Sequence, residues 1–117
     1  MNDTAARVIK ALTGKRFQLD TEVELQLQIA TIFTEAGLLF QREHRLDAKN
    51  RPDFFIDGLA IEIKIKGGAQ AIYRQCMRYC DFKEVTGLLL VTNRSMGFPP
   101  SLNGKPTYFF KLGAGWL

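Results

Sequence analysis

Residues 51 to 67 read RPDFFIDGLAIEIKIKG. Asp57–Gly58 is a two-residue turn typical of a β-hairpin, and apolar and charged residues alternate along the strand that follows it. A hairpin with this turn places Asp53 directly opposite Glu62, with Cβ atoms about 5 Å apart on the same face of the sheet. Lys64 shares that face because side chains alternate along a strand. The segment therefore predicts two carboxylates and a lysine at one spot.

Two carboxylates at this separation repel each other, so a positive charge is expected between them. A divalent cation bound by oxygen ligands would fit the arrangement. The alternative is that Asp53, Glu62 and Lys64 form the solvated outer face of an amphipathic hairpin. The pattern of the strand, taken alone, favours this second interpretation.

A further acid comes from the segment TEVELQLQIATIFTEAG (21 to 37), which is predicted to be the main helix. Thr21 and Glu24 have the spacing of a capping box, and Gly37 is placed to end the helix. Glu22 lies within the width of the apolar stripe, and an acid that faces the core needs a partner, such as the same cation. The alternative is a frayed first turn, in which Glu22 favours the helix dipole. The residues of the stripe are Leu25, Ile29, Ile32, Phe33 and Ala36.

The rest of the chain predicts an α/β fold, a mixed sheet flanked by helices. The order is helix, three strands, helix and two strands, preceded by a short amphipathic helix, and residues 94–105 are expected to be a loop. The elements outside the hairpin and the main helix are helices at 4–12 and 69–80 and strands at 38–46, 85–92 and 107–113.

Length and composition indicate one domain, residues 1–117, with 46% hydrophobic and 24% charged residues, an ordinary globular balance. The net charge of +4 points weakly to a polyanionic partner such as nucleic acid. No segment has the uninterrupted apolar core of a signal peptide or the length of a membrane span, so an intracellular, cytoplasmic protein is expected.

The cysteines and the histidine do not predict a metal site. Cys76 and Cys80 lie four residues apart, and His44 is distant in sequence. Three such residues fall short of a four-ligand zinc site, and the expectation is a pair of reduced thiols, although the count alone leaves a disulfide open.

The hairpin resembles the sequence motif of a known protein family. Pro52-Asp53, followed on the adjoining strand by Glu62-Ile63-Lys64, resembles the motif of the PD-(D/E)XK nuclease superfamily. Gln75 and Tyr79 are similar to the Gln-x-x-x-Tyr motif of its exonuclease-like branch. That pattern also has an acid on the preceding helix, which Glu22 matches better than Glu24.

The resemblance covers about residues 20–92 and implies a restriction-endonuclease-like fold. The size and the order of elements are similar to small Holliday-junction resolvases and to the VRR-NUC proteins of phages, so a phage origin is one expectation. The N-terminal helix (1–19) and the C-terminal strand and tail (93–117) would be additions to this core.

The resemblance also implies roles for individual residues. Asp53 and Glu62 would bind Mg²⁺, with Mn²⁺ as the usual substitute, together with the backbone carbonyl of Ile63. Glu22 would complete the site directly or through water. Lys64 would orient the attacking water or stabilise developing charge.

Gln75 and Tyr79 lie one turn apart on one helix face and would position metal-bound groups or the scissile phosphate. The alternative for this pair is a half-buried tyrosine packed beside a polar neighbour.

The implied function is a metal-dependent endo- or exodeoxyribonuclease acting on DNA, including branched or single-stranded structures in recombination, repair or phage DNA processing. The first alternative is a nucleic-acid-binding module with the same fold that does not cut, and the second is a structural or interaction protein. Candidate phosphate contacts are Lys10, Lys15, Arg16, Arg42, Arg45, Arg51, Lys66, Arg74 and Arg78.

A homodimer is also expected, because a two-fold symmetric junction needs two sites related by symmetry. Apolar residues near the C-terminus are the candidate interface, and their alternative role is to cover the sheet edge of a monomer. They are Phe98, Phe109, Phe110, Trp116 and Leu117.

Overall fold

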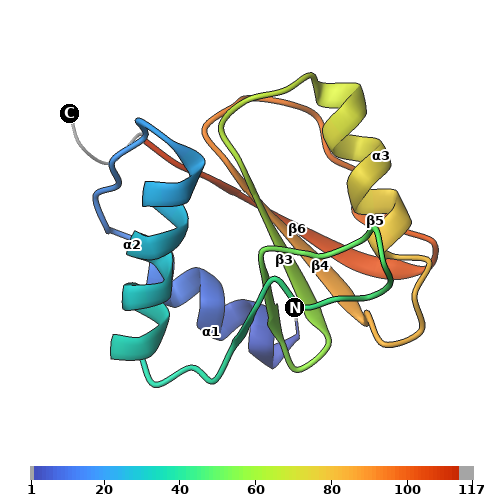
Figure 1. Ribbon diagram of the computed structural model, residues 1–117, viewed down its shortest axis with the longest axis horizontal. Helices are drawn as coiled ribbons and strands as arrows, with labels where there is room; N and C mark the ends of the chain where they lie inside the picture. Colours follow the sequence, from blue (N-terminus) through green and yellow to red (C-terminus); the bar gives the residue numbers. More distant parts are fainter. Residues whose placement is uncertain (1, 114–117) are drawn as a thin grey trace.

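A computed structural model describes residues 2–113. A mixed six-stranded sheet carries helices on both faces (Figure 1), which confirms the predicted α/β class. The sheet order is β1-β2-β3-β4-β6-β5, in which β3, β4 and β6 run parallel and the other neighbours are antiparallel. The elements are α1 (Asp3–Leu12), α2 (Glu22–Glu35), β1 (Gln41–Arg42), β2 (Phe54–Ile56), β3 (Leu59–Lys64), α3 (Ala69–Tyr79), β4 (Gly87–Thr92), β5 (Ser101–Leu102) and β6 (Lys105–Lys111).

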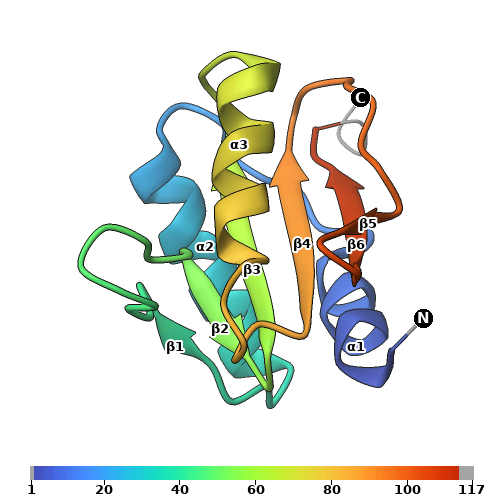
Figure 2. The ribbon, with the colours of Figure 1, turned by 90° about the vertical axis from the view of Figure 1, so that its right-hand side faces the viewer.

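The sheet separates two hydrophobic cores because its central strands are apolar on both faces. Helices α1 and α2 pack on one face, against Ile61 and Ile63 of β3. Helix α3 packs on the other face, against Ala60 of β3 and Leu90 of β4 (Figure 2). Every residue of β4 is buried, as predicted for a central strand.

The hairpin forms in the predicted register, with Ile56 opposite Leu59 and Phe54 opposite Ile61. Both turn residues have positive φ, Asp57 at 47° and Gly58 at 86°, as a type I′ turn requires. A Cβ atom on Gly58 would lie 2.3 Å from Oγ1 of Thr86, so glycine is needed for space as well as for backbone conformation.

Helix α2 begins as predicted, because the Thr21 hydroxyl accepts a hydrogen bond from the Glu24 amide at 3.1 Å. Gly37 has φ of 75° directly after the helix, in agreement with its predicted role as a stop. Four of the five predicted stripe residues are buried. Ala36 is exposed because the helix ends at Glu35.

The predicted strand 38–46 is largely wrong. Only Gln41 and Arg42 pair with β2, and Glu43 turns the chain away with φ of 49°. The predicted loop 94–105 contains β5, which turns into β6 through Asn103–Gly104, where both residues have positive φ. Strand β6 accordingly starts at Lys105 rather than at residue 107.

Cys76 and Cys80 are both buried, and no disulfide joins them in the structure. His44 lies elsewhere, stacked on Phe55 at 4.4 Å between ring centroids and 3.2 Å from Glu84. Within residues 2–113, no helix has the length and apolar character needed to cross a membrane.

The aromatic residues proposed for a dimer contact do not form one patch. Phe98 and Phe109 pack together beside the α3-side core, whereas Phe110 packs against the core under α1 and α2. All three are partly buried within the chain. Trp116 and Leu117 lie outside the described residues.

Candidate active site

The site begins where strand β2 starts, because pairing with β3 is interrupted there. Hydrogen-bonded and non-hydrogen-bonded pairs alternate along an antiparallel hairpin, starting at the turn. Phe54–Ile61 is therefore a hydrogen-bonded pair, and Pro52–Ile63 would be the next one. Proline has no N–H, so this pair cannot form completely. The Asp53 side chain replaces the backbone as the partner of Ile63, because its Oδ2 accepts a hydrogen bond from the Ile63 amide at 2.8 Å.

The same interruption affects the carbonyl of Ile63. In a hydrogen-bonded antiparallel pair the two residues exchange both N–H···O bonds. Because Pro52 has no N–H to donate, strand pairing leaves the Ile63 carbonyl without this partner at the edge where Asp53 lies. The backbone oxygen expected among the metal ligands therefore lacks a strand-pairing donor next to one of the two acids.

Glu62 is the buried member of the pair of acids, with 2% of its surface exposed. Its Oε1 lies 3.1 Å from the Tyr79 hydroxyl, and its Oε2 lies 3.4 Å from Nζ of Lys64. Gln75 donates to the Tyr79 hydroxyl at 2.9 Å, and that hydroxyl is also 3.2 Å from the carbonyl of Arg51. The single hydroxyl proton is therefore shared between Glu62 and the Arg51 carbonyl.

Helix α3 supplies this contact because Gln75 and Tyr79 occupy successive turns above the sheet. Tyr79 is buried, with 1% of its surface exposed. The predicted pair thus lies against Glu62, and the alternative of a tyrosine that only packs does not account for its hydroxyl contacts.

Burial dominates the electrostatics of both acids. Burial raises the pKa of Asp53 to about 6, and the nearby carboxylates of Glu22 and Glu43 add to the rise. Burial followed by repulsion from Asp53 raises the pKa of Glu62 to about 8, although Lys64 opposes the rise.

The pKa of Tyr79 is also raised, first by burial and then by the charge of Glu62. Its hydroxyl therefore remains a hydrogen-bond donor at neutral pH.

Glu22 reaches the same end of β3 from the first turn of α2. Its Oε2 accepts a hydrogen bond from the Ile65 amide at 2.9 Å, one alternation beyond the Ile63 amide bound by Asp53. Glu22 therefore has a structural partner directly after the end of β3. In residues 2–113, no three histidine, cysteine, aspartate or glutamate residues converge closely enough to form a metal site together. Its expected role in the site, directly or through water, stays a prediction.

The donor set of Asp53 and Glu62 fits a hard divalent cation. Both are oxygen ligands, and burial makes their charged forms costly. Lys64, whose side chain is 25% exposed, is the ammonium group in contact with Glu62. A cation held by both carboxylates and the Ile63 carbonyl would offset a repulsion that the protein groups only partly compensate.

Gln26 contacts the site but was not predicted from the sequence. Gln26 of α2 donates from Nε2 to Oδ1 of Asp53 at 3.1 Å, and its Oε1 accepts from Nη2 of Arg42 at 3.3 Å. The available signal was its spacing of four residues from Glu22, which places both side chains on neighbouring turns of one helix face.

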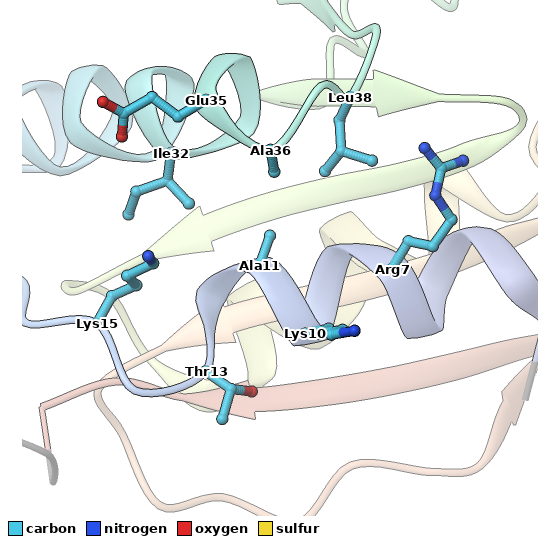
Figure 3. Close-up of a pocket in the computed structure, with 9 residues that line it drawn as sticks. All are labelled: Arg7, Lys10, Ala11, Thr13, Lys15, Ile32, Glu35, Ala36 and Leu38. Atoms are coloured by element: carbon cyan, nitrogen blue, oxygen red, sulfur yellow. The ribbon is translucent and has the colours of Figure 1, made fainter.

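The protein also has a cavity away from this site. A cavity of about 460 Å³ lies between α1 and α2 (Figure 3). None of Asp53, Glu62, Lys64, Gln75 and Tyr79 lines it, although Lys10 and Lys15, two of the candidate phosphate contacts, do. Its lining residues are Arg7, Lys10, Ala11, Thr13, Lys15, Ile32, Glu35, Ala36 and Leu38.

No family model, curated protein or solved structure matches the chain. The geometry of the site is therefore the basis for assigning a function.

Proposed function

We propose that the chain is a metal-dependent nuclease that hydrolyses phosphodiester bonds of DNA. The observation that carries the proposal is the buried Glu62 carboxylate beside Asp53, with Lys64 and Tyr79 in contact with it. Burying two neighbouring acids costs folding free energy, and such pairs are found where a function needs both charges. Binding a divalent cation is such a task.

In the proposed reaction, Asp53, Glu62 and the Ile63 carbonyl hold the cation. When bound, Mg²⁺ supplies a water of lowered pKa and neutralises charge on the phosphate. The Lys64 side chain contacts Glu62 and is partly exposed, so its ammonium can donate to the attacking water or to a phosphate oxygen. Tyr79 and Gln75 hold the Glu62 carboxylate in one orientation.

Basic side chains around the site support a polyanionic substrate. Arg51 precedes Pro52 and contributes its carbonyl to Tyr79, and Arg78 of α3 contacts Asn50 at 3.4 Å. Arg94 contacts the carbonyl of Gly67. These three come from separate segments that border the site, and their positive charge would attract a nucleic-acid backbone.

The PD-(D/E)XK resemblance and a restriction-endonuclease-like fold belong to the same proposal. Its support is the motif-bearing hairpin, followed by α3 and the parallel strand β4. Branched or single-stranded DNA is the proposed substrate. Cutting a symmetric junction requires two sites, so this version of the function needs a homodimer.

A second candidate is the nucleic-acid-binding module that does not cut. The observation that favours it is that the Glu22 carboxylate already accepts a hydrogen bond from the Ile65 amide. Such a module would retain the basic surroundings of the site and bind DNA equally well with and without a divalent cation.

One assay separates the two candidates. Plasmid, single-stranded and four-way-junction DNA are incubated with the protein in Mg²⁺ and, separately, in EDTA, with Asp53→Asn as the inactive control. The nuclease proposal expects cleavage in Mg²⁺ by the unmodified protein alone. DNA binding without cleavage under all conditions would favour the binding module, and neither binding nor cleavage would favour a structural or interaction protein.

A further inference from the structure

A hydrogen-bonded chain leads from strand β1 to the Asp53 carboxylate. Arg42 donates to Oε1 of Gln26 at 3.3 Å, and Nε2 of Gln26 donates to Oδ1 of Asp53 at 3.1 Å. A guanidinium group only donates, so the amide oxygen of Gln26 has to face Arg42 and its NH₂ has to face Asp53. The chain therefore has one direction, from the cation to the acid.

Arg42 is itself held in place. Its guanidinium carbon lies 5.6 Å from the ring centroid of Phe54, its partner across the β1–β2 pair. Phe54 is completely buried. Arg42 thus links the Gln26 amide to the β1–β2 pair, next to Phe54, which directly follows Asp53.

With Gln26 in this position, both oxygens of Asp53 carry a donor. Oδ1 receives the Gln26 amide and Oδ2 receives the Ile63 amide at 2.8 Å. Two donors from different directions fix the plane of the carboxylate, and each oxygen keeps a further lone pair for a cation. Gln26 itself is half-buried and reaches no other described group besides Asp53 and Arg42.

We propose that Gln26 is a positioning residue that, held by Arg42, orients the Asp53 carboxylate for the divalent cation. This inference rests on the proposed function, because it requires that Asp53 binds a cation. Partners of this kind, which orient a ligand without touching the metal, typically change metal affinity by about 10- to 100-fold when removed.

The test measures Mn²⁺ binding by titration calorimetry, in the absence of DNA, on the full chain. Gln26→Ala and Gln26→Met are each expected to weaken Mn²⁺ binding about tenfold or more. The methionine variant keeps most of the side-chain volume, so it remains informative if the alanine variant folds poorly. Arg42→Met should weaken binding in the same direction by a smaller factor, since Gln26 would keep its contact with Asp53.

Gln28 supplies a matched control on the same helix. Its amide also makes two hydrogen bonds, but to the backbone of Arg16 and Gln18 in the segment before α2. Gln28→Ala should therefore lower thermal stability and leave Mn²⁺ affinity unchanged. A loss of affinity in Gln28→Ala as large as in Gln26→Ala would overturn the positioning role, because the effect would then belong to the whole helix.

The other outcomes separate this inference from the proposed function. If the unmodified protein binds Mn²⁺ and Gln26→Met binds it equally well, the positioning role is wrong and the proposed function stands. If the unmodified protein binds no Mn²⁺, both are wrong. A second readout is the Mn²⁺ concentration dependence of DNA cleavage, which should shift to higher concentration in Gln26→Met while the rate at saturation is largely retained.

Discussion

Replacing Glu62 with glutamine removes a buried charge and almost none of the packing. The raised pKa means that folded Glu62 binds its proton more tightly than unfolded Glu62, so folding is favoured at low pH and opposed as pH rises. The pKa of Glu62 is raised from 4.5 to about 8, chiefly by burial, so this stability is lost between about pH 4.5 and pH 8. Without metal, the protein should be more stable at pH 5 than at pH 8.

The size of the effect follows from the same shift. Each pKa unit corresponds to about 1.4 kcal/mol, so a shift of more than three units sets an upper limit on the order of 4 kcal/mol at pH 8. Lys64 loses its partner in the variant but is partly exposed, so water can solvate it. We expect Glu62→Gln to raise the unfolding free energy by about 2 kcal/mol at pH 8 and by less than about 1 kcal/mol at pH 5.

Urea unfolding followed by circular dichroism, in EDTA at both pH values, measures these differences. Glu35→Gln is a suitable control because Glu35 is exposed on the last turn of α2, and it should change stability by no more than about 0.5 kcal/mol at either pH. If Glu62→Gln is less stable than the unmodified protein at pH 8, the Glu62–Lys64 contact is a stabilising ion pair and the reasoning is refuted.

Three further predictions concern neighbouring positions. Glu22→Gln should reduce cleavage at least tenfold, whereas Glu24→Gln should leave cleavage within twofold. Glu24→Gln should also cost less than about 1 kcal/mol in urea unfolding, since Glu24 contacts Thr21 through its backbone. The reverse order of the two effects on cleavage would make Glu24 the functional acid. Tyr79→Phe should lower the unfolding free energy by about 1–3 kcal/mol, because the hydroxyl contacts the buried Glu62 carboxylate and the Arg51 carbonyl. An unchanged value would show that these contacts are weak. Gly58→Ala should cost about 2 kcal/mol or more in thermal unfolding through its positive φ and its contact with Thr86, and Thr86→Ala should recover part of that loss.

Local sequence patterns predict much of the fold and bring the main residues of the candidate site together. The Asp57–Gly58 turn determines the register of β2 and β3, so the proximity of Asp53 to Glu62 follows from counting residues. Helical spacing likewise places Gln75 beside Tyr79. These inferences succeed because the relevant residues are close in sequence.

The wrong predictions of strands occur where the local sequence pattern does not determine the backbone conformation. The segment 38–46 has the pattern of a strand with a charged outer face, but Glu43 adopts a left-handed conformation and regular pairing ends after two residues. Strand β5 is too short to show alternation, and its only signal was the Asn103–Gly104 turn, which is itself a strong hairpin signature.

The Gln26 contact depends on tertiary structure. Gln26 and Arg42 are 16 residues apart, and Gln26 and Asp53 are 27 residues apart. No periodicity links positions at these separations. Only the packing of α2 beside the β1–β2 edge brings the three side chains together.

The central claim is that Asp53 and Glu62 hold a divalent cation. A crystal of the protein soaked in Mn²⁺ and measured near the manganese absorption edge tests it most directly. We expect one strong anomalous peak between the two carboxylates, in contact with the Ile63 carbonyl, and no such peak in crystals of Asp53→Asn. An empty position between the carboxylates in protein that cleaves DNA, or a peak that persists unchanged in the variant, would contradict the claim.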